Sequence, residues 1–225
     1  MSNSSINKAI IFGLGQIAEV AYYYLKNDSD YEVAGFTVDN EYIDADKFNN
    51  LPVVAFEEIS SIFPPDEYHI FIPVSYKNLN RNREEKFREA SKLGYQFASY
   101  VSSKAWVWEG FKTGRNCMIL ENNVIQPFVT IGDNCILWSG NHIGHHSKIE
   151  DNCFIASHVV ISGAVTVKHN CFIGVNATLR DSITIGERCV IGANALIMAD
   201  AEPEGVYIAN SATRAKIPST RLKKI

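Results

Sequence analysis

The chain has 225 residues, of which 46% are hydrophobic, and a formal net charge of −4 at pH 7. These values suit a soluble globular protein of one or two domains and do not indicate a polyanion-binding surface, so we expect no nucleic-acid partner. No apolar run approaches the roughly 20 residues that a transmembrane segment needs, and the N-terminus lacks a signal-peptide core. We therefore expect a cytoplasmic protein, a reading that leaves peripheral membrane association open.

The first hundred residues alternate short apolar runs with amphipathic stretches, a pattern typical of a small parallel α/β domain. The spacing predicts strands at 8–12, 31–38, 53–55, 69–74 and 95–100, and helices at 16–26, 56–62 and 80–92. The chain is expected to cross into a second domain around 102–110. We place the boundary of this Rossmann-like domain at 1–105.

A G-x-G-x-x-A turn joins the first predicted strand to the first predicted helix: Gly13, Leu14, Gly15, Gln16, Ile17 and Ala18. Glycines there let backbone amides approach a phosphate at the helix N-terminus. Asp39, at the end of the second strand, is placed to accept hydrogen bonds from a ribose or base. A tight turn that simply needs glycine is the structural alternative. One hundred residues supply only one mononucleotide half, which favours a UDP- or dTDP-linked ligand over NAD.

All five cysteines, Cys117, Cys135, Cys153, Cys171 and Cys189, are 18 residues apart. An aliphatic residue also recurs every six residues, at Ile119, Ile125, Ile131, Leu137, Ile143, Ile149, Ile155, Ile161, Val167, Ile173, Leu179, Ile185, Ile191 and Ile197. Three hexads per coil predict an all-β, triangular β-helix over 106–200, with these aliphatic residues inside. The cysteines are then an interior ladder of small hydrophobes. A metal, redox or nucleophilic role for them is the alternative.

A second column, Asn116, Asn134, Asn152, Asn170 and then Arg188, precedes the cysteines and indicates a structural corner, because Asn tolerates left-handed turns. Three of the six histidines lie together, at 142, 145 and 146. One coil further along, Gly163 is expected over His145 and Ala164 over His146, leaving a notch beside the imidazoles. Imidazole can take a proton near neutral pH, so this notch is a candidate active site. Histidines at the seam of a trimer are the alternative.

Together these residues resemble the hexapeptide-repeat acyltransferases, and more narrowly the sugar acetyltransferases of the bacillosamine-pathway and perosamine type. Those enzymes join a small Rossmann-like domain to a left-handed β-helix. The resemblance covers nearly the whole chain. It implies a homotrimer, acetyl-CoA as co-substrate, no metal, and N-acetylation of a nucleotide-linked deoxyamino sugar for a bacterial surface glycan such as O-antigen.

The resemblance also implies roles for residues in matching segments. His145 corresponds to the family's catalytic base, and His146 stands where the bacillosamine-pathway enzyme has an acidic residue, which leaves open what orients His145. The positions that line CoA are Gly163, Gly174, Val175, Gly192 and Ala193, and those that bind the nucleotide sugar are Leu14, Gly15, Gln16, Asp39, Asn40 and Ser75. The tail, 201–225, is expected to complete the CoA site, with Arg214 or Lys216 near the CoA phosphates.

Three other functions remain open from the sequence. Acetylation of a hydroxyl group, on sialic acid or another sugar, would use the same base. A γ-type carbonic anhydrase would need zinc held by histidines such as His142, His146 and His158, but the spacing fits that family poorly. A non-catalytic scaffold or NAD-dependent sensor is the third.

Overall fold

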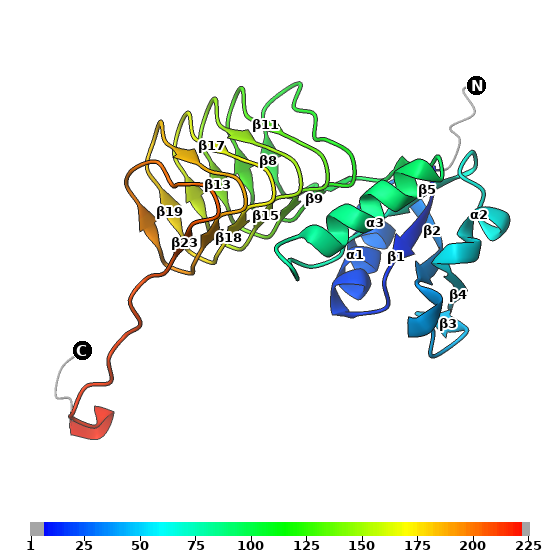
Figure 1. Cartoon of the computed structure of the whole chain (residues 1–225), viewed down its shortest axis with the longest axis horizontal. Coiled ribbons are helices and arrows are strands. Elements are labelled where there is room, and N and C mark those ends of the chain that lie inside the picture. Colours follow the sequence, from blue (N-terminus) through cyan, green and yellow to red (C-terminus); the bar gives the residue numbers. More distant parts are fainter. Residues whose placement is uncertain (1–6, 222–225) are drawn as a thin grey trace.

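The computed structural model describes residues 7–221, which form an α/β unit joined to a long parallel β-helix (Figure 1). The α/β unit contains one six-stranded sheet of order β3-β4-β2-β1-β5-β6, parallel except where β3 meets β4. Its strands are β1 (Asn7–Phe12), β2 (Tyr31–Val38), β3 (Lys47–Phe48), β4 (Leu51–Ala55), β5 (Tyr68–Phe71) and β6 (Gln96–Phe97). Its helices are α1 (Gln16–Asn27), α2 (Ile59–Ile62) and α3 (Arg81–Lys92), with single 3₁₀ turns at Asn40–Tyr42 and Phe56–Glu58.

The expected order of elements is confirmed, with two differences. The sequence pattern does not predict the short strand β3, which pairs antiparallel with β4. The strand expected over 95–100 is two strands: β6 ends the sheet at Phe97, and β7 (Tyr100–Val101) pairs with the β-helix instead. The Tyr100 amide donates to the carbonyl of Cys117, one coil further along, so the β-helix pairing begins before the expected boundary at 105/106.

The β-helix is a triangular prism with one short strand per side in each coil. The docked face carries β7, β9 (Met118–Ile119), β12 (Ile136–Leu137), β15 (Phe154–Ile155), β18 (Phe172–Ile173), β21 (Val190–Ile191) and β23 (Val206–Tyr207). The open face carries β8 (Trp106–Val107), β10 (Val124–Ile125), β13 (His142–Ile143), β16 (Val160–Ile161), β19 (Thr178–Leu179) and β22 (Leu196–Ile197). The polar face carries β11 (Thr130–Ile131), β14 (Lys148–Ile149), β17 (Thr166–Val167) and β20 (Thr184–Ile185).

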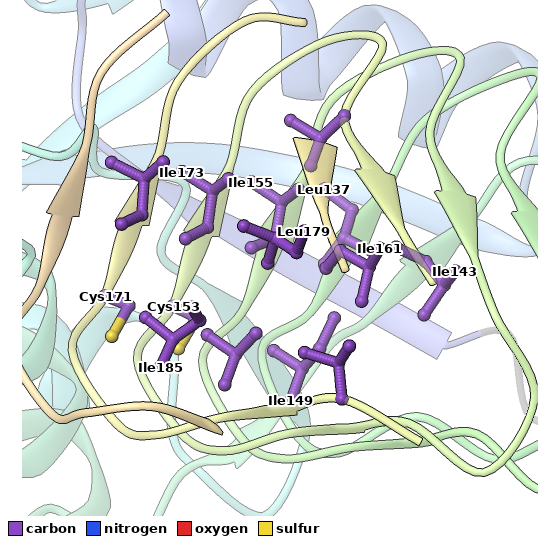
Figure 2. Close-up of a cluster of buried hydrophobic side chains, with 14 of the residues drawn as sticks. Leu137, Ile143, Ile149, Cys153, Ile155, Ile161, Cys171, Ile173, Leu179 and Ile185 are labelled. Carbon is purple, nitrogen blue, oxygen red and sulfur yellow. The ribbon is translucent and has the colours of Figure 1, made fainter. Parts of the chain in front are cut away.

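The predicted interior is confirmed. All fourteen hexad residues are buried, and so are the five cysteines (Figure 2). Each thiol donates to a backbone carbonyl of the next coil, as Cys135 does to Glu150 at 3.1 Å. Burial raises the pKa of the Cys135 and Cys153 thiols well above the ordinary pKa of a cysteine, so these thiols stay protonated and do not act as nucleophiles.

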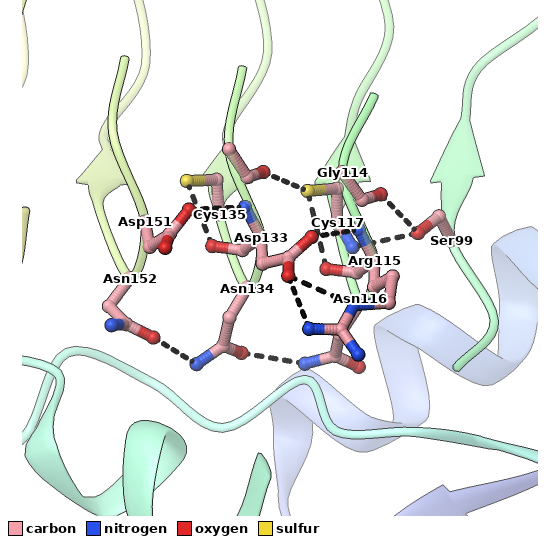
Figure 3. A network of polar contacts seen from close by, with 11 residues as sticks. Ser99, Gly114, Arg115, Asn116, Cys117, Asp133, Asn134, Cys135, Asp151 and Asn152 are labelled. Atoms are coloured by element: carbon pink, nitrogen blue, oxygen red, sulfur yellow. Dashed lines mark hydrogen bonds and ion pairs between the residues drawn. The ribbon is translucent and has the colours of Figure 1, made fainter. Parts of the chain in front are cut away.

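The asparagine column also forms as expected (Figure 3). Asn116 donates to Asn134, and Asn134 donates to Asn152, each at 2.7 Å. All members, including Arg188, have positive φ values near 60°, the left-handed conformation that asparagine adopts at low cost. At its start the ladder meets the α/β unit, because Asn116 exchanges hydrogen bonds with both backbone groups of Ile72.

The two units share a continuous core. Helix α1 lies between the sheet and the docked face, and its Ala18, Ala21 and Leu25 belong to one buried cluster with Met118 and Ile136 of the β-helix. The other side of the sheet packs against α2 and α3 in a separate cluster. This junction fixes the end of β1 next to the middle coils of the prism.

The C-terminal part of the chain continues the pairing to β23 and then leaves the prism (Figure 1). Pairing therefore extends past the expected end at residue 200, since Ala201 bridges to Ile185 and β23 pairs with β21. Among residues 7–221, no helix is long and apolar enough to span a membrane. The expectation that the N-terminus lacks a signal-peptide core concerns a segment that includes residues 1–6, and these residues lie outside the described range.

Candidate active site

A pair of exposed histidines occupies the corner between the open and the polar face, directly after β13. The backbone amide of His145 donates to Oε1 of Gln126 at 2.9 Å, which anchors the turn to the preceding coil. His146 has a φ of 60°, a left-handed conformation that turns its side chain out of the prism. The expected placement of both imidazoles at a corner is confirmed.

The next coil brings Gly163 against the ring of His145. Their stacking is fixed by the amide of Ala164, which donates to the carbonyl of His145 at 2.8 Å. A Cβ atom added to Gly163 would lie 2.7 Å from both Cε1 and Nε2 of the imidazole, closer than van der Waals contact allows. The expected stacking of Gly163 over His145 is therefore present, and a residue with a Cβ atom at this position would displace the ring.

The two histidines also contact each other. Their Nδ1 atoms are 3.1 Å apart, and the rings stand nearly perpendicular at 85°. The ring of Phe128, one coil earlier, lies 4.7 Å from that of His146 and supports it from the side. In a hydrogen bond one Nδ1 donates and the other accepts, so this contact orients the imidazole of His145, for which the sequence indicated no partner.

The glycine turn has the geometry of an anion-binding site. Gly13 takes a φ of 109° and donates to the carbonyl of Thr37 at 2.7 Å, which bends the chain sharply after β1. Gly15 then caps α1 without any side-chain hydrogen bond, and a Cβ there would meet nothing within 4 Å. Free amides at a helix N-terminus attract phosphate, and here they face open space.

The other expected nucleotide residues surround this turn at the carboxyl ends of the strands. Asp39 forms an ion pair with Lys86 of α3 at 2.6 Å. Burial opposes the charge of Lys86, but its hydrogen bonds to Asp39 and Glu89 outweigh that effect and raise its pKa. The amide of Asn40 donates to Glu57 at 3.1 Å, and the carbonyl of Ser75 accepts from Arg83. Asp39 thus carries a cationic partner that the sequence did not reveal.

An aromatic cleft of about 220 Å³ lies where the α/β unit meets the docked face. Tyr76 stands over it, with its ring 5.0 Å from Phe154 and 4.7 Å from Phe172. The lining residues come from the α1 turn, the loop after β5 and three coils of the β-helix: Ile17, Tyr76, Trp138, Phe154, Ala156, Ser157, Phe172 and Val175. The cleft thereby connects the glycine turn to one of the positions expected to line CoA.

The structure divides the expected CoA positions between two corners. Gly163 lies with His145 at the open–polar corner, whereas Gly174, Val175, Gly192 and Ala193 lie at the corner between the docked and the open face. The whole open face separates the two groups within one chain. Gly174 and Gly192 are stacked, because a Cβ on Gly174 would lie 2.8 Å from the carbonyl carbon of Gly192.

Other candidates are not brought together. His142 lies on the open face, His146 at the open–polar corner and His158 at the docked–open corner, where its ring covers Gly140. Within residues 7–221, no cluster of three or more His, Cys, Asp or Glu side chains could hold a metal ion. Arg214 and Lys216 lie on the exposed tail beyond β23.

Sequence reasoning missed the aromatic lining and the two basic residues of α3. The aromatic residues left a signal: the outward position of the docked face is apolar in successive coils, at Met118, Ile136, Phe154 and Phe172. Arg83 and Lys86 left none, because they stand among other charges on a polar helix.

Comparisons with known proteins agree with this architecture. The bacterial transferase hexapeptide family (six repeats) matches residues 112–145 and 164–199. Perosamine N-acetyltransferase from Caulobacter crescentus, solved with CoA and GDP-perosamine, is 21% identical with a TM-score of 0.78, covering 89% of this chain and 93% of that chain. The acetyltransferase domain of PglB from Neisseria gonorrhoeae, solved with acetyl coenzyme A, is 20% identical with a TM-score of 0.75. This structural match covers 88% of this chain and 94% of the PglB domain.

WeeI from Acinetobacter baumannii is 15% identical with a TM-score of 0.62, over 88% of this chain and 94% of that one. Curated protein sequences gave no match. The parallel coils and the hexapeptide match fit a left-handed β-helix. The chain thus carries the hexapeptide repeats of bacterial transferases and has the two-unit fold of perosamine N-acetyltransferase and the PglB acetyltransferase domain.

Proposed function

We propose that this protein transfers the acetyl group of acetyl-CoA to an amine on a nucleotide-linked deoxyamino sugar, as part of bacterial surface glycan synthesis. The observation that carries the proposal is the exposed imidazole of His145, whose Nε2 edge lies against Gly163 of the next coil at a corner of the β-helix. Two relatives of the same fold, solved with CoA or acetyl-CoA, and one of them with a nucleotide-linked amino sugar, support it.

The α/β unit would hold the nucleotide. Its parallel strands β4-β2-β1-β5-β6 follow the first five positions of the dinucleotide-fold order 3-2-1-4-5-6, so we infer a Rossmann-like unit. The glycine turn would receive the pyrophosphate at the start of α1. Asp39 and Lys86, which lie beyond the strand ends, would contact the nucleoside, and the aromatic cleft would receive the apolar side of the sugar.

His145 would act as the general base. Nε2 removes a proton from the sugar amine as the amine attacks the thioester carbonyl, so the C–N bond forms and the C–S bond then breaks. The backbone N–H of Gly163 would stabilise the oxyanion. His145 returns its proton to the departing thiolate, which gives free CoA and needs no acyl-enzyme.

The open face gives a reason to propose a homotrimer. Four of its six outward residues are apolar and exposed, with 55% of Trp106, 37% of Val124, 39% of Val160 and 62% of Leu196 accessible; the other two are His142 and Thr178. The docked face is covered by the α/β unit, and the polar face presents threonine and lysine. A row of exposed large apolar residues along one face is unusual for a monomer, and parallel copies of the same chain would cover it.

Such a trimer would also join the divided site. If the open faces of three chains surround a threefold axis, the open–polar corner of each chain meets the docked–open corner of the next. His145 and Gly163 of one subunit would then face the corner of its neighbour that borders the aromatic cleft, and Val175 and Ala193 would follow one and two coils further along the same corner. We therefore propose that each active site is shared by two subunits.

An acceptor panel tests the function. UDP-, dTDP- and GDP-linked amino sugars, each paired with the matching hydroxy sugar, are incubated with acetyl-CoA, and release of free thiol is followed. We expect turnover with an amino sugar and none with its hydroxy counterpart. Turnover with the hydroxy sugars alone would indicate an O-acetyltransferase, and no thiol release with any acceptor would overturn the proposal.

A further inference from the structure

We propose that His146 is the positioning residue of the active site: its neutral Nδ1 accepts a hydrogen bond from Nδ1–H of His145. The inference rests on the proposed function for the direction of this hydrogen bond and for its catalytic consequence, but not for the contact itself. The two Nδ1 atoms are 3.1 Å apart, within hydrogen-bond distance, and the two rings stand at 85° to each other. The pair is thus a hydrogen bond between two imidazoles rather than a stack.

The proposed role of His145 as the base sets the direction of this hydrogen bond. The other ring nitrogen of His145, Nε2, is the atom that lies against Gly163 in the notch. A base needs an unprotonated Nε2 there, which requires the proton of neutral His145 to reside on Nδ1. His146 must then present an unprotonated Nδ1 and carry its own proton on Nε2.

His146 is held for this role by its surroundings. The ring of Phe128 contacts it at 4.7 Å, and Trp108 supports Phe128 at 5.9 Å. Its backbone amide donates to the carbonyl of Pro127 at 3.2 Å. Because the backbone of His146 is left-handed, its side chain leaves the corner in a different direction from that of a residue in the right-handed conformation.

A pair of two neutral histidines differs in net charge from a pair of a carboxylate and a histidine. An acidic neighbour stabilises imidazolium and raises the pKa of the base, whereas neutral His146 only accepts a hydrogen bond. If His146 takes a proton, its Nδ1–H must donate to His145, which moves the proton of His145 to Nε2 and removes the base. Protonation of either ring therefore inactivates the pair.

The groups around the pair are neutral within the described part of this chain. Gln126 and Phe128 face it from the preceding coil and Gly163 from the following one. The charged residues in the same corner column are Glu109 and Asp181, two coils before and two coils after His145. Lys148 begins the polar face, where it is paired with Glu150 at 3.3 Å.

Two variants separate positioning from folding. His146→Ala removes the acceptor without straining the corner, since Ala164 already takes a φ of 58° at the same place one coil later. We expect kcat to fall roughly 10- to 100-fold, the loss typical when the partner that orients a functional histidine is removed, with KM unchanged. His146→Glu restores an acceptor, so kcat recovers, and the acidic limb of its pH profile moves to higher pH than in the unaltered protein.

The decisive readout is the tautomer of His145, measured by ¹⁵N NMR of histidine-labelled protein without substrates. His145→Gln identifies its signals. We expect Nδ1–H in the unaltered protein and in His146→Glu, and a shift toward Nε2–H in His146→Ala. An Nε2–H tautomer in the unaltered protein, or no change in His146→Ala, would overturn the proposal. Because no turnover is involved, this result stands apart from any failure of the acetyltransferase assignment.

Discussion

Replacing His145 by alanine is expected to lower kcat for acetyl transfer by roughly 10²- to 10⁴-fold, the usual contribution of a positioned general base. The side chain is exposed, and its ring fills only the space over Gly163. Stability should therefore change by less than about 0.5 kcal/mol, as for other surface substitutions. Steady-state kinetics with the best acceptor of the panel, together with thermal unfolding, measures both effects.

His169→Ala is the matched control. This histidine also lies at a corner of the prism, but at the polar–docked corner, where its Nδ1 contacts Asn170 at 3.1 Å. We expect its turnover to stay close to that of the unaltered protein. Near-normal turnover of His145→Ala would show that another group removes the proton, and an equal loss in both variants would point to a general structural effect.

Replacing Arg83 by methionine is expected to cost roughly 3–5 kcal/mol of stability, the range seen when a buried charged group or its partners lose their hydrogen bonds. Arg83 is fully buried, and burial lowers its pKa to about 10, so it remains charged at neutral pH. Its donors all reach backbone carbonyls. Nε and Nη2 contact the β-helix at Asn134, Asn152 and Cys153, at 3.1 to 3.2 Å.

Nη1 of Arg83 reaches the other unit, at Val74 (3.0 Å) and Ser75 (3.4 Å). One guanidinium thus ties the loop after β5 to two coils of the prism, with a geometry that only the five donors of arginine supply. Methionine would fill much of the volume but leave the carbonyls without donors. Arg81→Met, at an exposed position of the same helix, is the control.

Chemical denaturation at fixed protein concentration measures the difference between the two arginine variants. A loss below about 1 kcal/mol for Arg83→Met would mean that water replaces the lost donors. Since Ser75 and Tyr76 flank the aromatic cleft, the same substitution should also raise KM for the nucleotide sugar more than KM for acetyl-CoA.

The interior of the β-helix could be predicted from the sequence because each coil repeats the same local choice. An aliphatic residue every six positions and a cysteine every eighteen set the register, and that register alone places Gly163 over His145. The same register also fixes which residues point outward: mostly threonines on the polar face and mostly apolar residues on the docked and open faces. The character of each outer face could therefore be predicted from the sequence as well.

Contacts between segments far apart in the chain could not be predicted in this way. Arg83 meets Asn152 of the β-helix across 69 residues, and Lys86 meets Asp39 within the α/β unit across 47. Nothing in the local pattern of α3 distinguishes these side chains from the exposed charges beside them, because their contacts depend on how α3 packs against the sheet and the prism. The contact between His145 and His146 likewise depends on ring rotamers, which sequence spacing does not fix.

The central claim is that the nucleotide turn of one subunit works with His145 of its neighbour. Gly15→Glu provides the second variant for its test, because a Cβ atom at this position meets no other atom within 4 Å and the glutamate brings a negative charge to the proposed phosphate site. We expect Gly15→Glu alone to fold and assemble but to be nearly inactive through a raised KM for the sugar nucleotide.

The most direct measurement is therefore the activity of mixed trimers. His145→Ala and Gly15→Glu subunits are unfolded together, refolded at equal amounts, and checked by native mass spectrometry for mixed assembly. If each site combines two subunits, random mixing makes one site in four intact, so about a quarter of the unaltered turnover should return. Mixed trimers that stay as inactive as either parent would contradict a shared site.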